Sequence, residues 1–259
     1  MAEVSSHAPG SFCWVELVAN DAPEAGRFYQ DVFGWEKREI PMGPDSVYTI
    51  FQQDGRDVAA MYGRGPEERV GPPHWRSYVA VESADESAAR AVELGADVVA
   101  PPFDVSDVGR MTLLRDPSGA TVALWEARSH IGVGRTGEPG AMSWNELLTR
   151  DVDVAAKFYT ALFGWDARVE RYGDADYTVF ERSGEVVAGM IATPDPADAP
   201  PNWLPYFGAA SCDDRVRSVR SAGGNVFVAP TDVPGVGRFA VLGDVHGAVF
   251  AIVQEEGWS

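Results

Sequence analysis

The sequence predicts an α+β protein built from four βαβββ units, two in each of two tandem modules. The first observation is a long internal repeat. Residues 14–36 (WVELVANDAPEAGRFYQDVFGWE) align with residues 144–166 (WNELLTRDVDVAAKFYTALFGWD), and ten of these 23 positions are identical at an offset of 130. The second observation is that each copy contains strand and helix patterns twice. Self-similarity over such a length indicates a duplicated structural unit.

The repeat continues to the end of each copy. Residues 98–110 align with 226–238, and residues 116–124 align with 244–252, both at an offset of 128. A glycine-rich, polar segment separates the two copies, as is typical of a linker. We therefore expect a first module at residues 1–128, a linker at 129–140 and a second module at 141–259.

Each unit begins with a strand followed by a helix. Residues 12–18 are rich in aromatic and β-branched side chains, which favours a strand. Asp21 and Glu24 then offer a capping box, and apolar residues recur after them at helical spacing. Gly34 follows the last of these and predicts the end of the helix. The second unit repeats this order, with a strand at 76–81 and a helix at 85–94 that Gly95 closes.

Short strands around turns complete each unit. An Asp54–Gly55 turn predicts a hairpin, and the DPSG sequence that begins at Asp116 predicts a second turn. The strands expected around these turns in the first module lie at residues 47–51, 58–62, 110–114 and 121–125.

Composition narrows the possible partners. The formal net charge of −18 disfavours binding to nucleic acid or to an anionic membrane. No apolar run approaches the ~18–20 residues that a membrane helix needs. Cys13 and Cys212 are the two cysteines, which predicts neither a disulfide framework nor a thiolate metal site. We expect a cytoplasmic protein.

The motifs resemble those of one superfamily. FYQDVFGW (residues 28–35), FYTALFGW (residues 158–165) and DPSG before the last strand are similar to sequences of the vicinal oxygen chelate superfamily, which includes glyoxalases, bleomycin resistance proteins and extradiol dioxygenases. The resemblance implies that each module is an eight-stranded, U-shaped half-barrel around a small-molecule site. Single modules of this kind pair with each other, so we expect the two modules to pair within one monomeric chain.

The resemblance also locates the metal ligands of the family, and this chain lacks ligand side chains there. The first-strand and last-strand positions hold Trp14, Ala123, Trp144 and Ala251. The fifth-strand position falls near Arg76 and Leu204, and the fourth strands contain no carboxylate, histidine or glutamine. His74 would reach a ligand position only if the register differed by two residues, and is otherwise a solvated residue before a strand. We expect no metal and no cofactor.

Alternation along the strands predicts what lines each cup instead. If the ligand position faces the cup, so does the residue two further on. The predicted lining consists of Trp14, Glu16 and Tyr78 in the first module, and of Trp144, Glu146 and Tyr206 in the second.

Each of these residues has a second interpretation. The tryptophans could belong to the core. Arg110 and Arg238 could anchor an anionic group of a ligand, or could tie a loop to the sheet. Glu16 and Glu146 could act as a general acid or base with a raised pKa, or could make structural hydrogen bonds inherited through the duplication.

Three functions follow from these alternatives. The first is binding of a small hydrophobic, planar molecule in an aromatic-lined cup, like the sequestration that bleomycin resistance proteins perform. The second is a metal-independent acid–base enzyme that tailors a natural product. The third, a metal-dependent glyoxalase or dioxygenase, is disfavoured by the residues in the ligand positions.

Overall fold

The computed structural model describes residues 4–44, 46–65, 71–172, 175–193 and 200–256. We define the first module by β1 (Phe12–Ala19), α1 (Ala22–Phe33), β2 (Glu36–Gly43), β3 (Ser46–Gln53), β4 (Arg56–Gly63), β5 (His74–Ala80), α2 (Ala84–Glu93), β6 (Asp97–Val105), β7 (Gly109–Arg115) and β8 (Thr121–Ala127). The second module contains β9 (Met142–Thr149), α3 (Val152–Phe163), β10 (Asp166–Tyr172), β11 (Ala175–Arg182), β12 (Glu185–Ala192), β13 (Asn202–Gly208), α4 (Cys212–Ser221), β14 (Asn225–Val233), β15 (Gly237–Gly243) and β16 (Val249–Glu255).

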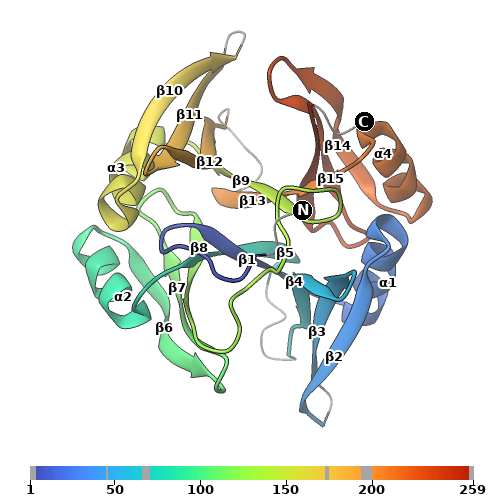
Figure 1. The fold of residues 1–259 in the computed structure, drawn as a ribbon, viewed down its shortest axis with the longest axis horizontal. Helices are drawn as coiled ribbons and strands as arrows, with labels where there is room; N and C mark the ends of the chain where they lie inside the picture. The colour runs from blue at the N-terminus through green and yellow to red at the C-terminus, as the bar shows by residue number, and fades with distance from the viewer. Residues whose placement is uncertain (1–3, 45, 66–70, 173–174, 194–199, 257–259) are drawn as a thin grey trace.

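Each module forms one mixed eight-stranded sheet. The strand order is β2-β3-β4-β1-β5-β8-β7-β6 in the first module and β10-β11-β12-β9-β13-β16-β15-β14 in the second. β1 runs parallel to β4 and antiparallel to β5, so the two βαβββ units of a module meet at its centre. In Figure 1 the two sheets curl with their central strands back to back and their concave sides open in opposite directions. The predicted α+β architecture of four βαβββ units is confirmed.

The helix boundaries agree closely with the capping signals. Asp21 accepts a hydrogen bond from the Glu24 backbone N–H at 2.9 Å, and Gly34 ends α1 with a left-handed φ of 74°. The same device recurs in α3, where Asp151 is the N-cap and Gly164 has a φ of 67°. α2 begins one residue earlier than expected because Ser83 caps it.

One strand of each unit has no counterpart in the sequence prediction. These are the outer strands β2, β6, β10 and β14, which lie at the two edges of each sheet. Most of their side chains are exposed on both faces, so no apolar alternation marks them in the sequence. They extend the walls of the two cups.

The modules dock through a continuous hydrophobic core. The Phe207 ring of β13 lies between aromatic rings of the first module, with centroids 5.3 Å from Phe33, 5.3 Å from Trp35 and 5.2 Å from Trp75. α1 also packs against α4, and α2 against α3. In the described part of the chain, no helix is long and apolar enough to cross a membrane.

Two buried hydrogen-bonded chains cross this interface in equivalent places. Trp203 Nε1 donates to the Tyr159 hydroxyl at 2.8 Å, and that hydroxyl donates to Asp116 Oδ2 of the other module at 2.6 Å. In the equivalent set of hydrogen bonds, Trp75 Nε1 donates to the Tyr29 hydroxyl at 2.9 Å, and the Tyr29 hydroxyl donates to Asp244 at 3.3 Å. Each module therefore completes the hydrogen bonding of a turn in the other.

Candidate functional site

A carboxylate lies at the centre of the first cup and is fully partnered. The hydroxyls of Tyr48 and Tyr78 donate to Glu16 at 2.9 and 2.8 Å. Arg76 Nη1 lies 3.4 Å from the same carboxylate, and Trp14 Nε1 donates to the Tyr48 hydroxyl at 3.2 Å. Burial opposes the charge on Arg76, but Tyr78 and Glu16 beside it hold the pKa of this guanidinium above its ordinary value. The first cup thus contains a complete internal ion pair.

The second cup repeats this arrangement without the cation. The Tyr206 hydroxyl donates to Glu146 at 2.9 Å, and Tyr177 also hydrogen-bonds to this carboxyl. Trp144 Nε1 donates to the Tyr177 hydroxyl at 3.0 Å. Leu204 pairs with Glu146 across the strands at the position where Arg76 pairs with Glu16. Burial raises the pKa of Glu146, and the two tyrosine hydroxyls offset only part of that effect.

The segment between the modules packs against the first cup. The His130 ring lies edge-on to Trp14 with centroids 4.7 Å apart, and the His130 carbonyl accepts a hydrogen bond from Trp125 at 2.9 Å. Val133 is fully buried, and its N–H donates to the Cys13 carbonyl. Gly132 has a φ of 111°, and a Cβ there would lie 2.1 Å from the Cys13 carbonyl oxygen, so this position requires glycine.

This packing closes the first cup. Figure 1 shows the segment on the concave side of the first sheet. The exposed fraction of Trp14 is 5%, and that of Tyr78 is 3%. The glycine-rich linker is therefore a fixed structural element and not a flexible tether.

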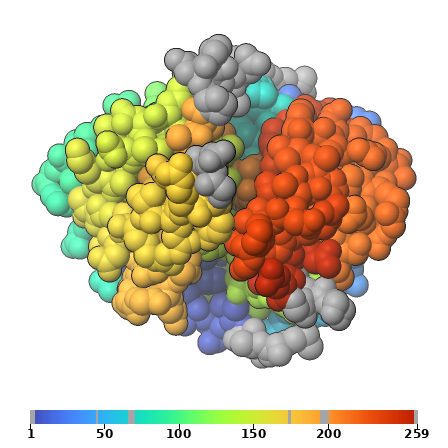
Figure 2. Space-filling view, turned by 90° about the horizontal axis from the view of Figure 1, so that it is seen from above, coloured from blue at the N-terminus to red at the C-terminus, as the bar shows by residue number. Residues whose placement is uncertain are grey.

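The second cup is open. Its apolar lining forms a cluster of its own in which Leu204, Tyr206, Ala251 and Val253 are buried, whereas Trp144, Leu148, Phe239 and Val241 are partly exposed. Figure 2 views the molecule from this side and shows a groove between the wall of β10 and β11 and the wall of β14 and β15. Of the aromatic residues that the sequence predicts for the two cups, Trp144 is partly exposed, whereas Tyr206, Trp14 and Tyr78 are buried.

One wall of the second cup is polar. On β10, Glu170 lies opposite Tyr177, whose hydroxyl reaches Glu146, so Glu170 shares the concave face. Arg168 forms ion pairs with Glu170 and with Glu181 of β11. The three charged groups leave a net negative charge at the mouth of the cup.

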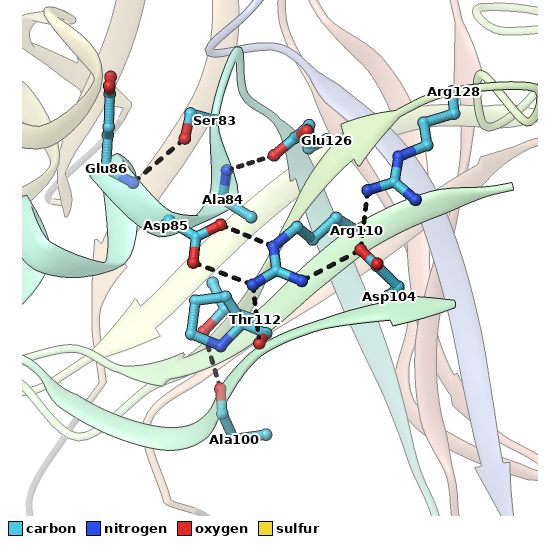
Figure 3. Close-up of polar contacts among 11 residues, drawn as sticks. Ser83, Ala84, Asp85, Glu86, Ala100, Asp104, Arg110, Thr112, Glu126 and Arg128 are labelled. Carbon is cyan, nitrogen blue, oxygen red and sulfur yellow. Dashed lines mark hydrogen bonds and ion pairs between the residues drawn. The ribbon is translucent and has the colours of Figure 1, made fainter. Parts of the chain in front are cut away.

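The structure places Arg110 and Arg238 away from both cups. Arg110 bonds Asp85 of α2 at 2.6 and 2.9 Å and Asp104 of β6 at 3.0 Å, as Figure 3 shows. The next residue, Met111, contacts the Tyr78 hydroxyl in the cup, so Arg110 points to the opposite face of the sheet. Arg238 repeats these bonds with Asp213 of α4 and with a β14 aspartate. Both arginines join a helix to its sheet and are outside the candidate site.

The donor groups in the cups do not fit the metal that the fold family implies. In the first cup the one carboxylate is already bonded by two tyrosines and an arginine, and a cation beside Arg76 would be repelled. In the second cup the family's ligand positions hold Trp144, Leu204 and Ala251, and none of these side chains can bind a metal ion. Among the described residues, no group of three histidine, cysteine or acidic side chains could hold a metal ion.

The structure brings together six of the side chains that the sequence predicts for the two cups. Trp14, Glu16 and Tyr78 converge in the first cup, and Trp144, Glu146 and Tyr206 in the second. It missed Tyr48 and Tyr177, the second tyrosine of each set. A signal was present, since Tyr48 opens YTIF and Tyr177 opens YTVF at corresponding places in the two copies.

Comparison with known proteins agrees with this fold. The family model of the Glyoxalase/Bleomycin resistance protein/Dioxygenase superfamily matches residues 11–124 and again residues 141–252. The chain is 37% identical over 257 residues to "Putative glyoxylase CFP32" of Mycobacterium tuberculosis, covering 98% of both chains. It is 35% identical to "Anthracycline biosynthesis protein DauV" of a Streptomyces species, covering 95% of this chain and 94% of that one.

Solved structures share the fold at low sequence identity. A Mn(II)-bound glyoxalase from Novosphingobium aromaticivorans superposes with a TM-score of 0.66 at 18% identity, covering 95% of this chain and 82% of that chain. The 2,3-dioxygenase LapB from a Pseudomonas species gives a TM-score of 0.66 at 14% identity, covering 94% and 91%. With its two family matches and its full-length relatives, this chain belongs to the glyoxalase/bleomycin resistance/dioxygenase superfamily.

Proposed function

We propose that the cup of the second module binds a small, flat, hydrophobic molecule without a metal. The observation that carries this proposal is the partly exposed aromatic and aliphatic lining around Glu146, in contrast to the closed lining around Glu16. A concave apolar surface with few polar groups suits such ligands. The name of the relative DauV supports a ligand of this shape, because anthracyclines are flat polycyclic aromatic molecules.

Acid–base catalysis on the bound molecule is the second candidate, and one observation favours it. Burial raises the pKa of Glu146, as is common for a carboxyl that delivers or accepts a proton near neutral pH. Under this alternative, Glu146→Gln keeps ligand affinity while turnover falls by roughly 10²–10⁴-fold. Under binding alone, Glu146→Gln has no turnover to lose and changes affinity for a neutral ligand by about 1 kcal/mol.

Equilibrium dialysis with acridine, a flat aromatic probe, tests the binding proposal. We expect one molecule bound per chain, in the second cup. Trp144→Ala should abolish this binding because Trp144 is part of the accessible wall. Trp14→Phe is the matched control in the closed cup and should leave binding intact. Two bound molecules per chain, or loss of binding in Trp14→Phe but not in Trp144→Ala, would refute the assignment to the second cup.

A further inference from the structure

The two cups differ at one charge. Both contain a glutamate that accepts hydrogen bonds from two tyrosines, and in both a tryptophan donates to one of those tyrosines. In the first cup a guanidinium, that of Arg76, completes the set at 3.4 Å from the carboxylate. In the second cup an aliphatic side chain, that of Leu204, stands in the equivalent register position.

The absence of that cation leaves Glu146 without a counter-ion. Among the described residues, no lysine, arginine or histidine forms an ion pair with Glu146, whereas Glu16 has one. A carboxylate that lies among apolar groups is costly unless a positive charge or a proton neutralises it. In the first cup, Arg76 of the same chain supplies the positive charge that neutralises Glu16. In the second cup, a bound ligand could supply the positive charge that neutralises Glu146.

The surroundings of Glu146 suit an organic cation. Tyr177 and Tyr206 meet the carboxyl through their hydroxyls, and Trp144 bonds the Tyr177 hydroxyl, so three aromatic side chains lie around this group. The partly exposed Phe239 ring lies next to Tyr206, with centroids 6.4 Å apart. Aromatic faces attract cations, most strongly when water is displaced. Such an arrangement favours a weakly hydrated organic cation over a small, strongly hydrated inorganic one.

We infer that the ligand of the second module is a flat aromatic molecule that carries a positive charge, and that this charge lies beside Glu146 as the Arg76 guanidinium lies beside Glu16. The inference rests on the proposed binding function and specifies its ligand class. The Glu170 and Glu181 carboxylates at the mouth outnumber the single guanidinium of Arg168, and the whole chain has a net charge of −18. Both features attract a cation toward this opening.

The test compares two probes of nearly equal shape at pH 8. N-methylacridinium has a permanent positive charge, whereas acridine is neutral at this pH. We expect the unmodified protein to bind N-methylacridinium about tenfold more tightly or better, which corresponds to about 1.4 kcal/mol. Equal affinities for the two probes would overturn the inference and leave the proposed function standing. Failure of both probes to bind would overturn both.

Variants then assign the preference to the Glu146 carboxylate. Leu204→Arg copies the first cup into the second, and its guanidinium should compete with the probe and weaken N-methylacridinium binding at least tenfold. Val169→Arg is the matched control, because it adds the same charge on an exposed side chain of β10 that does not share the face of Glu170. Unchanged binding in a folded Leu204→Arg protein would overturn the inference.

Glu146→Gln gives an independent measurement if Leu204→Arg fails to fold. This change keeps the shape of the side chain and removes its charge. Acridine affinity should be retained, and the preference for N-methylacridinium should fall to within about twofold. A preference that survives in Glu146→Gln would place the cation elsewhere and overturn the inference.

Discussion

Removal of one hydroxyl should loosen the two modules from each other. The Tyr159 hydroxyl is fully buried, accepts from Trp203 at 2.8 Å and donates to Asp116 of the other module at 2.6 Å. Tyr159→Phe keeps the ring and deletes both bonds. The indole N–H then has no acceptor, and the carboxylate loses one donor. Tyr29→Phe makes the same change in the equivalent set of hydrogen bonds, where the bond from Tyr29 to Asp244 is longer, at 3.3 Å.

The distances predict different losses for the two variants. An unsatisfied buried donor costs about 1–3 kcal/mol, and a hydrogen bond to a charged group contributes about 1.5–3 kcal/mol. Tyr159→Phe incurs both effects, so we expect the free energy of unfolding to fall by about 3–5 kcal/mol. Tyr29→Phe loses the indole acceptor but only a weak bond to the carboxylate, so its loss should be about 1–3 kcal/mol.

Urea unfolding followed by tryptophan fluorescence measures both variants against the unmodified protein. The comparison requires similar m-values, since a changed m-value would report a different denatured state. An equal or smaller loss in Tyr159→Phe than in Tyr29→Phe would refute the argument from bond length. Losses below about 0.5 kcal/mol in both would show that the cross-module chains contribute nothing measurable to stability.

Three further predictions follow from the site. Trp14→Ala should lower the free energy of unfolding by about 3–5 kcal/mol because Trp14 is buried in the closed cup, and thermal unfolding measures this. Because burial raises the pKa of Glu146, its contribution to stability is present at low pH and is lost as pH rises from the ordinary glutamate pKa through the folded-state pKa. The stability of Glu146→Gln relative to the unmodified protein should therefore increase over this rise in pH, as urea unfolding at a series of pH values measures. Dialysed protein should contain no stoichiometric metal by elemental analysis, and added Mn²⁺, Ni²⁺ or Zn²⁺ should leave its unfolding temperature unchanged, because the family's ligand positions hold Trp14, Ala123, Trp144 and Ala251.

Helix-capping residues predicted the helix boundaries from the sequence, because a cap forms hydrogen bonds with backbone groups only a few residues away. The N-cap at Asp21 and the left-handed Gly34 fix the ends of α1 without help from distant residues. The outer strands had no such signal. β2 and its equivalents are exposed on both faces, and their pairing with the next strand comes from backbone hydrogen bonds that no side-chain pattern records.

The closed first cup could not be predicted from composition. Glycine-rich segments are typical of flexible linkers, yet Gly132 is glycine because the chain passes too close to a carbonyl of β1 for any side chain. The direction of the Arg110 side chain could not be predicted from its residue type either. Its type suggested an anion anchor as well as a structural tie, and only the register of β7 shows that its side chain faces α2 and not the cup.

Duplication explains why both cups contain a carboxyl that is hydrogen-bonded by two tyrosines, and divergence explains why the described lining residues of the two cups differ in exposure. Equivalent tryptophan and tyrosine side chains make the hydrogen bonds around the carboxyl in both modules, as inheritance from a single ancestral unit would produce. In the first module, Arg76 pairs with the charge of Glu16, and the segment around His130 covers the apolar surface at Trp14. The hydrogen-bonded set there contributes to the structure of the module. In the second module Leu204 stands in place of the arginine and the lining stays partly exposed, and this difference between the modules is the basis of the binding site that we propose there.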